Sequence, residues 1–159
     1  MAGASNGVCN CSAEQIQRYL ARISGPLLDR IDIHVEVLRP EVPVLDLSAA
    51  NAEASADIRA RVVHARQRQL RRSGAANALL DVGGIRQHCA LRPPEQALLE
   101  QAALKLDLSP RACHRVLKVA RTIADLDGAE RIGTAQLAEA IALRKPALGA
   151  SRTSGRKIA

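Results

Sequence analysis

The sequence predicts a mainly α-helical chain, in which four or five helices form a bundle over about residues 50–143. Three observations support this fold class. The apolar residues are nearly all Ala, Leu, Val and Ile, and the chain has one aromatic residue, Tyr19. Ala and Leu lose little entropy in a helix. From about residue 50 onward the apolar residues also recur at helical spacing, and Pro, Ser, Thr and Gly stand where helices begin and end.

The N-terminal part has a different pattern. Residues 1–11 show no periodicity, and we expect them to be disordered. Ser12-Ala13-Glu14-Gln15 has the form of a capping box and opens a helix that stops at Ser24-Gly25-Pro26. From Leu27 to Leu38 apolar and polar residues alternate, which predicts a strand with one buried face. Because one strand cannot fold alone, we expect its partner strands to lie in sequence outside this chain.

The helical part divides at its Gly and Pro residues. We expect a long helix from about Ala50 to Ser73, closed by Gly74. Its spacing directs Ile58, Val62 and Ala65 inward.

Three shorter segments follow, and their boundaries also come from single residues. A short helix is expected near Ile85–Cys89, and Pro93-Pro94 opens the next helix. Ser109-Pro110 repeats that opening signal for a helix that ends near Gly128. Thr134 is expected to cap the last helix, and residues 145–159 to form a disordered basic tail.

Positive charge is concentrated in two stretches of a chain whose net charge is +7. Six arginines and no acid lie between Arg59 and Arg72, and five basic residues and no acid lie between Arg144 and the C-terminus. A basic cluster can bind phosphate, either of ATP or of nucleic acid, whereas the alternative is a solvated helix face and a tail. The candidates for nucleic-acid contact are Arg59, Arg66, Arg68, Arg71 and Arg72. The lack of aromatic residues for base stacking and of a clear helix-turn-helix speaks against this role.

Several kinds of catalytic and membrane protein are excluded by the sequence. It has no G-x-x-x-x-G-K-[ST] phosphate loop, no apolar strand ending in paired acids, no G-x-S-x-G and no H-E-x-x-H. No apolar run approaches the roughly 20 residues of a membrane span. The scattered cysteines suggest reduced thiols, and we expect a cytoplasmic protein without a membrane partner.

The cysteines give weak evidence for a metal site. Cys9-Asn10-Cys11 is half of a zinc site at most, and whether it belongs to one stays open. His88-Cys89 and Cys113-His114 are adjacent pairs, and neighbouring side chains on a helix point about 100° apart. Core thiols and surface histidines are therefore favoured over metal ligands, and no metal residue is predicted.

Three runs of sequence resemble one family. They are C-S-A-E-Q-I-Q-R-Y-L-A-R-I-S-G-P-L-L-D-R-I-D-I-H-V-E-V (residues 11–37), the region 55–70 with its S-A-D-I-R-A-R-V core, and S-P-R-A-C-H-R-V-L-K-V-A-R-T-I-A-D-L (residues 109–126). They closely resemble bacterial AAA+ ATPases of the magnesium-chelatase-like, ComM type. The resemblance implies the C-terminal third of such a protein. Residues 12–47 would then be a helix-strand remnant of the α/β ATPase core, and residues 48–144 the helical lid.

The resemblance also implies roles for single arginines. In Leu27-Leu28-Asp29-Arg30-Ile31-Asp32 the family places an arginine finger, so Arg30 is the catalytic candidate; the alternative is a local ion pair with Asp29 or Asp32. The lid motif places the sensor-2 arginine, which contacts nucleotide, at Arg111. Arg115 and Arg121 are alternative candidates for this contact. The interpretation without a binding role is that Arg111 simply faces solvent.

The activity of the family indicates which cofactors and partners to expect. ATP and Mg²⁺ would be bound mainly by the missing N-terminal ATPase core, and neighbouring subunits of a homo-oligomeric ring would share each site. The chain alone would then not be an enzyme. The ComM-type members suggest a DNA-remodelling motor, and the alternatives are a metal-chelatase ATPase subunit or a stand-alone helical domain that binds nucleic acid.

Overall fold

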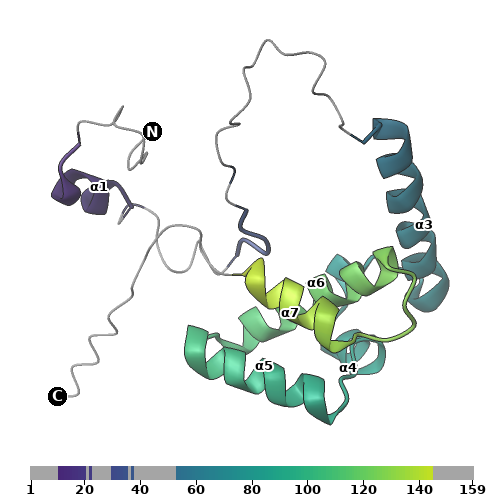
Figure 1. The fold of residues 1–159 in the computed structure, drawn as a ribbon. Coiled ribbons are helices and arrows are strands. Elements are labelled where there is room, and N and C mark those ends of the chain that lie inside the picture. Colours follow the sequence, from purple (N-terminus) through teal and green to yellow (C-terminus); the bar gives the residue numbers. More distant parts are fainter. Residues whose placement is uncertain (1–10, 21, 23–29, 36, 38–52, 145–159) are drawn as a thin grey trace.

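The helical prediction is confirmed by the computed structural model, which describes residues 11–20, 22, 30–35, 37 and 53–144 (Figure 1). Five α-helices and one 3₁₀ helix lie within residues 53–144, and α1 stands apart from them in Figure 1. The elements are α1 (Ala13–Leu20), α3 (Ser55–Ser73), η2 (Asn77–Leu79), α4 (Val82–His88), α5 (Pro93–Leu106), α6 (Pro110–Leu126) and α7 (Thr134–Ala142).

Helix α6 is the centre of the bundle. It contacts α3, η2, α4 and α7, while α5 packs against α7. Its buried stripe repeats every four residues and consists of small side chains, which let the neighbouring helices come close: Ala112, Val116, Ala120 and Ala124. Leu137 of α7 is fully buried against this stripe.

Most helix boundaries follow the local sequence signals. Ser12 and Gln15 form the predicted capping box, since each backbone N–H donates to the other side chain, at 2.8 and 3.3 Å. Gly74 closes α3 with φ of 69°, and its N–H donates to the Leu70 carbonyl at 2.8 Å. Ser109 caps α6 by accepting from the Ala112 N–H at 3.2 Å.

The predicted cap of the last helix was wrong by one residue. Gly133 is the N-cap of α7 and Thr134 is its first helical residue. The Gly133 N–H donates to the side chain of Gln136 at 3.0 Å, and no side chain of the N-cap accepts from the first turn of the helix. Thr134 instead donates its hydroxyl to the buried carboxylate of Glu95 on α5, at 2.8 Å.

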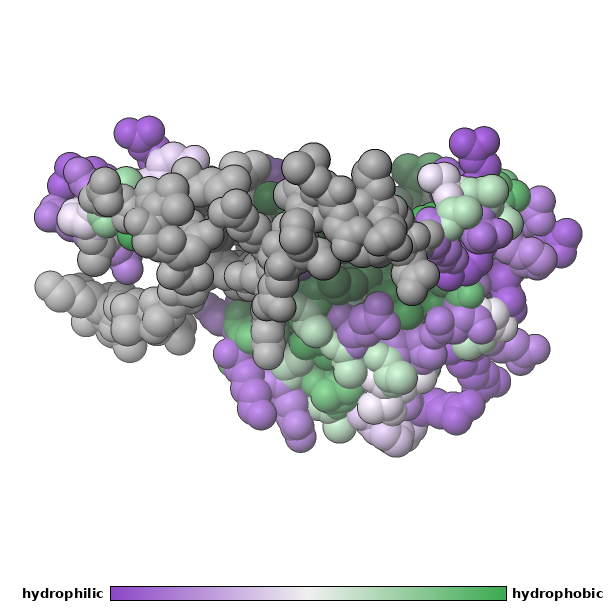
Figure 2. Space-filling model, turned by 45° about the horizontal axis from the view of Figure 1, so that its top comes forward, coloured by the Kyte–Doolittle hydropathy of each residue, from purple (hydrophilic) through white to green (hydrophobic). Residues whose placement is uncertain are grey.

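The predicted inward face of α3 is only half correct. Ala65 and Gln69 are buried, but Ile58 and Val62 are 43% and 54% exposed. The helix extends past the other described helices, and none of them covers its first ten residues (Figure 1). At the right of Figure 2, where α3 lies, apolar and hydrophilic residues are mixed on the surface. Spacing alone could not reveal where the covering helix ends.

The predicted strand does not form in residues 30–35, which are described without helix or strand. A strand needs a neighbour to pair with, and these residues instead hydrogen-bond to the end of α7. The backbone N–H of His34 donates to the Leu143 carbonyl at 2.7 Å. The rest of the predicted strand, residues 27–29, 36 and 38, lies outside the described residues.

Two further predictions fall on parts of the chain that are not described. The predicted disorder of residues 1–10 and 145–159 lies outside the described residues, as does Cys9.

In the part of the chain that is described, none of the helices combines the length and apolar character needed to span a bilayer.

Candidate functional site

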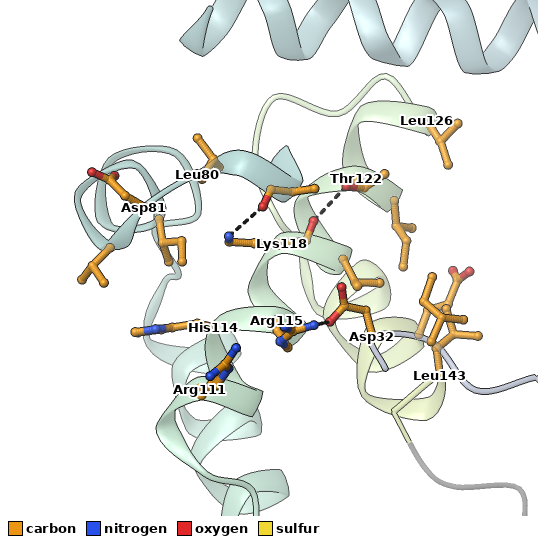
Figure 3. A pocket seen from close by; sticks show the side chains of 17 residues that line it. Asp32, Leu80, Asp81, Arg111, His114, Arg115, Lys118, Thr122, Leu126 and Leu143 are labelled. Carbon is orange, nitrogen blue, oxygen red and sulfur yellow. Dashed lines mark hydrogen bonds and ion pairs between the residues drawn. The ribbon is translucent and has the colours of Figure 1, made fainter. Parts of the chain in front are cut away.

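A cavity of about 600 Å³ opens along one side of α6. Its other walls come from η2 and the start of α4, from α7, and from the segment around Asp32 (Figure 3). The apolar part of the wall includes Leu80, Ile85, Val119, Ile123 and Leu143.

The basic residues of this cavity come from one helix. Arg111, Arg115 and Lys118 lie at positions i, i+4 and i+7 of α6, so they share a face, and all three line the cavity together with His114. Ser109 fixes where the helix begins and thereby places Arg111 in its first turn.

Arg111 is the sequence-predicted nucleotide contact, and its side chain is exposed at the cavity. Within the described residues it makes no hydrogen bond and no ion pair. A cation in the first turn also opposes the helix dipole, which costs a few tenths of a kcal/mol unless an anion lies nearby. Arg111 is therefore a cation placed where an anion would stabilise it.

Arg115, the alternative to Arg111, is already engaged. Its guanidinium forms an ion pair with the carboxylate of Asp32 and donates to the Arg30 carbonyl at 2.8 Å (Figure 3). Lys118 donates across the cavity to the Ala78 carbonyl of η2 at 3.0 Å. These two cations hold the walls together, in contrast to Arg111.

Residues 30–34, which we call the 30–34 strap, are attached to the bundle at several points. Besides the contacts of Arg115, the guanidinium of Arg144 donates to the Ile31 carbonyl, and the His34 N–H donates to Leu143. The structure thus brings the backbone of Arg30 beside α6, the helix that carries Arg111. The side chain of Arg30 is exposed. Asp29, one of its two predicted ion-pair partners, lies outside the described residues, and the carboxylate of the other, Asp32, binds Arg115.

Arg121, the other alternative, faces the bundle interior and is 2% exposed. It donates to the carbonyls of Ala129 and Glu130 at 2.7 and 2.8 Å, and it lies 3.1 Å from the carboxylate of Asp125. Burial lowers the pKa of the Arg121 guanidinium despite the nearby carboxylate. This arginine has a structural role and does not line the Arg111 cavity.

Asp125 is the centre of a buried ionic cluster that sequence reasoning missed. Its carboxylate accepts from Arg72 at 2.5 and 2.8 Å and from the Asn77 amide at 2.9 Å. Burial alone would raise the pKa of Asp125, but the hydrogen bonds from Arg72 and Asn77 and the positive charges of Arg121 and Arg72 outweigh it, so the pKa is lowered. The signal in the sequence was an arginine and an aspartate four residues apart within an apolar stripe.

The basic stretch of α3 serves more than one purpose. Arg68 donates to the Gly128 carbonyl at 2.6 Å, and Arg72 belongs to the buried cluster, so both attach α3 to the bundle. Arg59, Arg66 and Arg71 are exposed and have no side-chain partner among the described residues. Two of the five predicted nucleic-acid contacts are thus used inside the fold.

Of the two predicted core thiols, Cys89 and Cys113, the structure buries only the first. Cys89 is buried, and burial raises the pKa of its thiol to about 11. Cys113 and His88 are half-buried. No group of His, Cys, Asp and Glu side chains suited to a metal ion occurs in the described ranges, which include Cys11 but not Cys9.

Comparison with known proteins identifies the relatives of this chain. The family described as "Magnesium chelatase, subunit ChlI C-terminal" matches residues 52–144, which is more than half of the chain. This chain belongs to the magnesium chelatase ChlI family. The family described as "Magnesium chelatase, subunit ChlI" also matches residues 1–45. The ChlI-family assignment agrees with the resemblance predicted from the sequence.

Two curated relatives of this ChlI-family chain are much longer than it is. YifB of Escherichia coli is 44% identical over 134 residues, and competence protein ComM of Haemophilus influenzae is 44% identical over 133 residues. Both matches cover 84% of this chain and 26% of the relative. The chain therefore spans about a quarter of the length of these relatives.

Proposed function

We propose that this ChlI-family chain supplies the lid and the trans-acting arginine of a ring-forming AAA+ ATPase. The observation that carries the proposal is the position of Arg111: a cation in the first turn of α6 that has no partner in the described part of the chain and is exposed at a cavity of about 600 Å³. In this proposal Arg111 binds a phosphate of the nucleotide held by its own subunit. Arg30 acts on the nucleotide of the neighbouring subunit.

The chemistry explains why arginines suit both roles. Phosphoryl transfer spreads negative charge over the γ-phosphate oxygens, and a planar, permanently charged guanidinium binds two of them. ATP and Mg²⁺ would be held mainly by an ATPase core outside this chain, and Arg111 would complete the site from the lid. The ion pair of Arg115 with Asp32 supports a positioning role for Arg115, because it joins α6 to the 30–34 strap.

The physical substrate is a finer part of the same proposal. One relative is named a competence protein, and the basic stretches of this chain suit a partner rich in phosphate. We favour a cytoplasmic motor that acts on DNA over a metal-chelatase subunit. Within this proposal the chain by itself does not hydrolyse ATP.

A chimaera tests the two arginines. In it, this chain replaces the matching 134 residues of Escherichia coli YifB, and ATP hydrolysis and nucleotide affinity are measured separately. Arg30→Ala should lower hydrolysis by about 10³–10⁵-fold while leaving affinity nearly unchanged, because a finger acts on transition-state charge. Arg111→Ala should weaken nucleotide affinity. The matched control is Arg22→Ala, an exposed arginine outside both motifs.

Mixing subunits shows whether Arg30 acts across a boundary. Arg30→Ala subunits and subunits with a disabled phosphate loop are each inactive alone. In a mixed ring an intact Arg30 can face an intact phosphate loop, so activity should partly return. If subunits exchange and hydrolysis stays at background, Arg30 does not act in trans.

A second candidate function is nucleic-acid binding by α3. The observation that favours it is that Arg59, Arg66 and Arg71 are exposed and unpaired within the described residues. Arg59→Ala with Arg66→Ala should weaken binding to duplex DNA and reduce the slope of log affinity against log salt by about 2. Arg86→Ala on α4 is the control. An unchanged slope would remove α3 as the contact.

A further inference from the structure

A second cavity, of about 370 Å³, lies between the ends of α3 and α4 and the loop that joins α6 to α7. It shares no lining residue with the Arg111 cavity. Four arginines, one histidine and one acid line it: Arg72, Arg92, Arg121, Arg131, His88 and Glu130. Such a concentration of guanidinium groups around a small cavity suits an anion.

The wall of this cavity contains an excess of positive charge. Arg72 and Arg121 share one carboxylate, that of Asp125, so one half-buried and one buried cation face one buried anion. The Nε atoms of both arginines are buried and have no hydrogen-bond partner among the described residues. A buried cation that is not fully compensated is costly, and an anion in the adjoining cavity would offset part of that cost.

The exposed rim of the cavity adds further positive charge. Arg92 and Arg131 are exposed, and neither has a side-chain partner among the described residues. Arg92 lies at the start of α5, and Arg131 in the loop before α7. Counting Asp125 and Glu130 against the four arginines leaves an excess of two positive charges around the cavity.

We propose that this cavity binds a phosphate group, either as inorganic phosphate or on a small phosphorylated molecule. Arg92 and Arg131 would contact the phosphate oxygens, since guanidinium groups bind such oxygens in pairs. The volume exceeds what a phosphate needs, and the apolar side chains of Leu91 and Ile132 line the remainder. The site is independent of the nucleotide contact assigned to Arg111.

A titration followed by NMR tests the site in the chain as it stands. Phosphate and AMP are added separately at constant ionic strength, with chloride as the reference anion. We expect saturable shifts of the backbone amides in residues 87–92 and 130–132. Tighter binding of AMP than of phosphate would identify a phosphorylated molecule as the ligand class, and equal affinity would identify the free anion.

Rim substitutions provide the matched comparison, because exposed arginines can be replaced without disturbing the core. Arg92→Gln with Arg131→Gln should weaken binding at least about tenfold. Arg86→Gln, exposed on α4 outside both cavities, should leave it unchanged. Circular dichroism shows that each variant is folded.

Three results would overturn the site. Shifts that grow linearly without saturating would mean diffuse attraction to a basic protein. Saturable shifts confined to residues 111–118 would place the anion in the other cavity. An affinity that is unchanged in the rim variant would show that Arg92 and Arg131 do not contact the anion.

Discussion

Two arginines of α6 lie in opposite environments. Arg121 is 2% exposed and contacts two carbonyls and a carboxylate, whereas Arg111, on the cavity side, is exposed and unpartnered among the described residues. The fold therefore uses one arginine inside the bundle and leaves the other available. Burial and partners, rather than residue type, separate a structural arginine from a candidate binding arginine.

The largest effect on stability is expected when the carboxylate that binds Arg121 is removed. Asp125→Ala removes the carboxylate shared by the buried Arg121 and the half-buried Arg72, and the loss of one partner of a buried ion pair costs about 3–5 kcal/mol. Urea unfolding followed by circular dichroism measures it. The control is Asp127→Ala, an exposed aspartate at the end of the same helix whose carboxylate contacts Gln136; it should cost less than about 1 kcal/mol. Equal losses would mean that the cluster is not a main support of the bundle.

A smaller effect should appear as a pH dependence. The pKa of Asp125 is lowered in the folded chain, so its contribution to stability is present above the unfolded pKa of about 3.9 and is lost as the pH falls through the folded value. The free energy of unfolding should fall more steeply below about pH 4 in the wild type than in Asp125→Asn. Parallel curves would contradict the lowered pKa.

Ser109, the N-cap of α6, should contribute less to the free energy of unfolding than Asp125 does. Ser109→Ala removes the hydroxyl that accepts from the Ala112 N–H, and loss of such a cap costs about 1 kcal/mol. The melting temperature and the amide exchange of residues 110–113 measure the effect. Ser109→Asp, which retains an acceptor, should restore stability; if it does not, the hydroxyl does not act as a cap.

The smallest effect on stability is expected at Arg111. Because this side chain has no partner in the described chain, Arg111→Ala should change the free energy of unfolding by no more than about 0.5 kcal/mol. The sign should be neutral or slightly favourable, since a cation is removed from a helix N-terminus. A loss above 1 kcal/mol in urea unfolding would show that Arg111 supports the fold and would weaken its assignment to a ligand.

Local signals in the sequence predicted the helices well. Gly74, Pro93 and Ser109 each marked a boundary correctly, because capping depends on residues within one turn of the helix end. Exposure along α3 was not predictable in the same way. Ile58 and Ala65 share an apolar stripe, and only the length of the neighbouring α6 decides which of them is covered.

The site could be predicted only in part for a related reason. The spacing of Arg111, Arg115 and Lys118 shows that they share a helix face. It cannot show that Arg115 would be paired with Asp32, a residue 83 positions away in the sequence. The cluster of Arg72 and Asp125 joins residues 53 positions apart and was missed for the same reason. Long-range pairing of charges leaves almost no trace in local sequence.

The protrusion of α3 has a mechanical consequence. Its buried residues, Ala65 and Gln69, lie toward its C-terminal end, where Arg68 and Arg72 also attach it to the bundle. The ten residues before Ala65 form a rod about 15 Å long that is clamped at one end. Such a rod is a lever arm: a rotation of 10° at the clamp moves its tip by about 2.6 Å, for a rise of 1.5 Å per residue. A small change in angle at the clamp would thus become, at Ser55, a displacement large enough to make or break a contact.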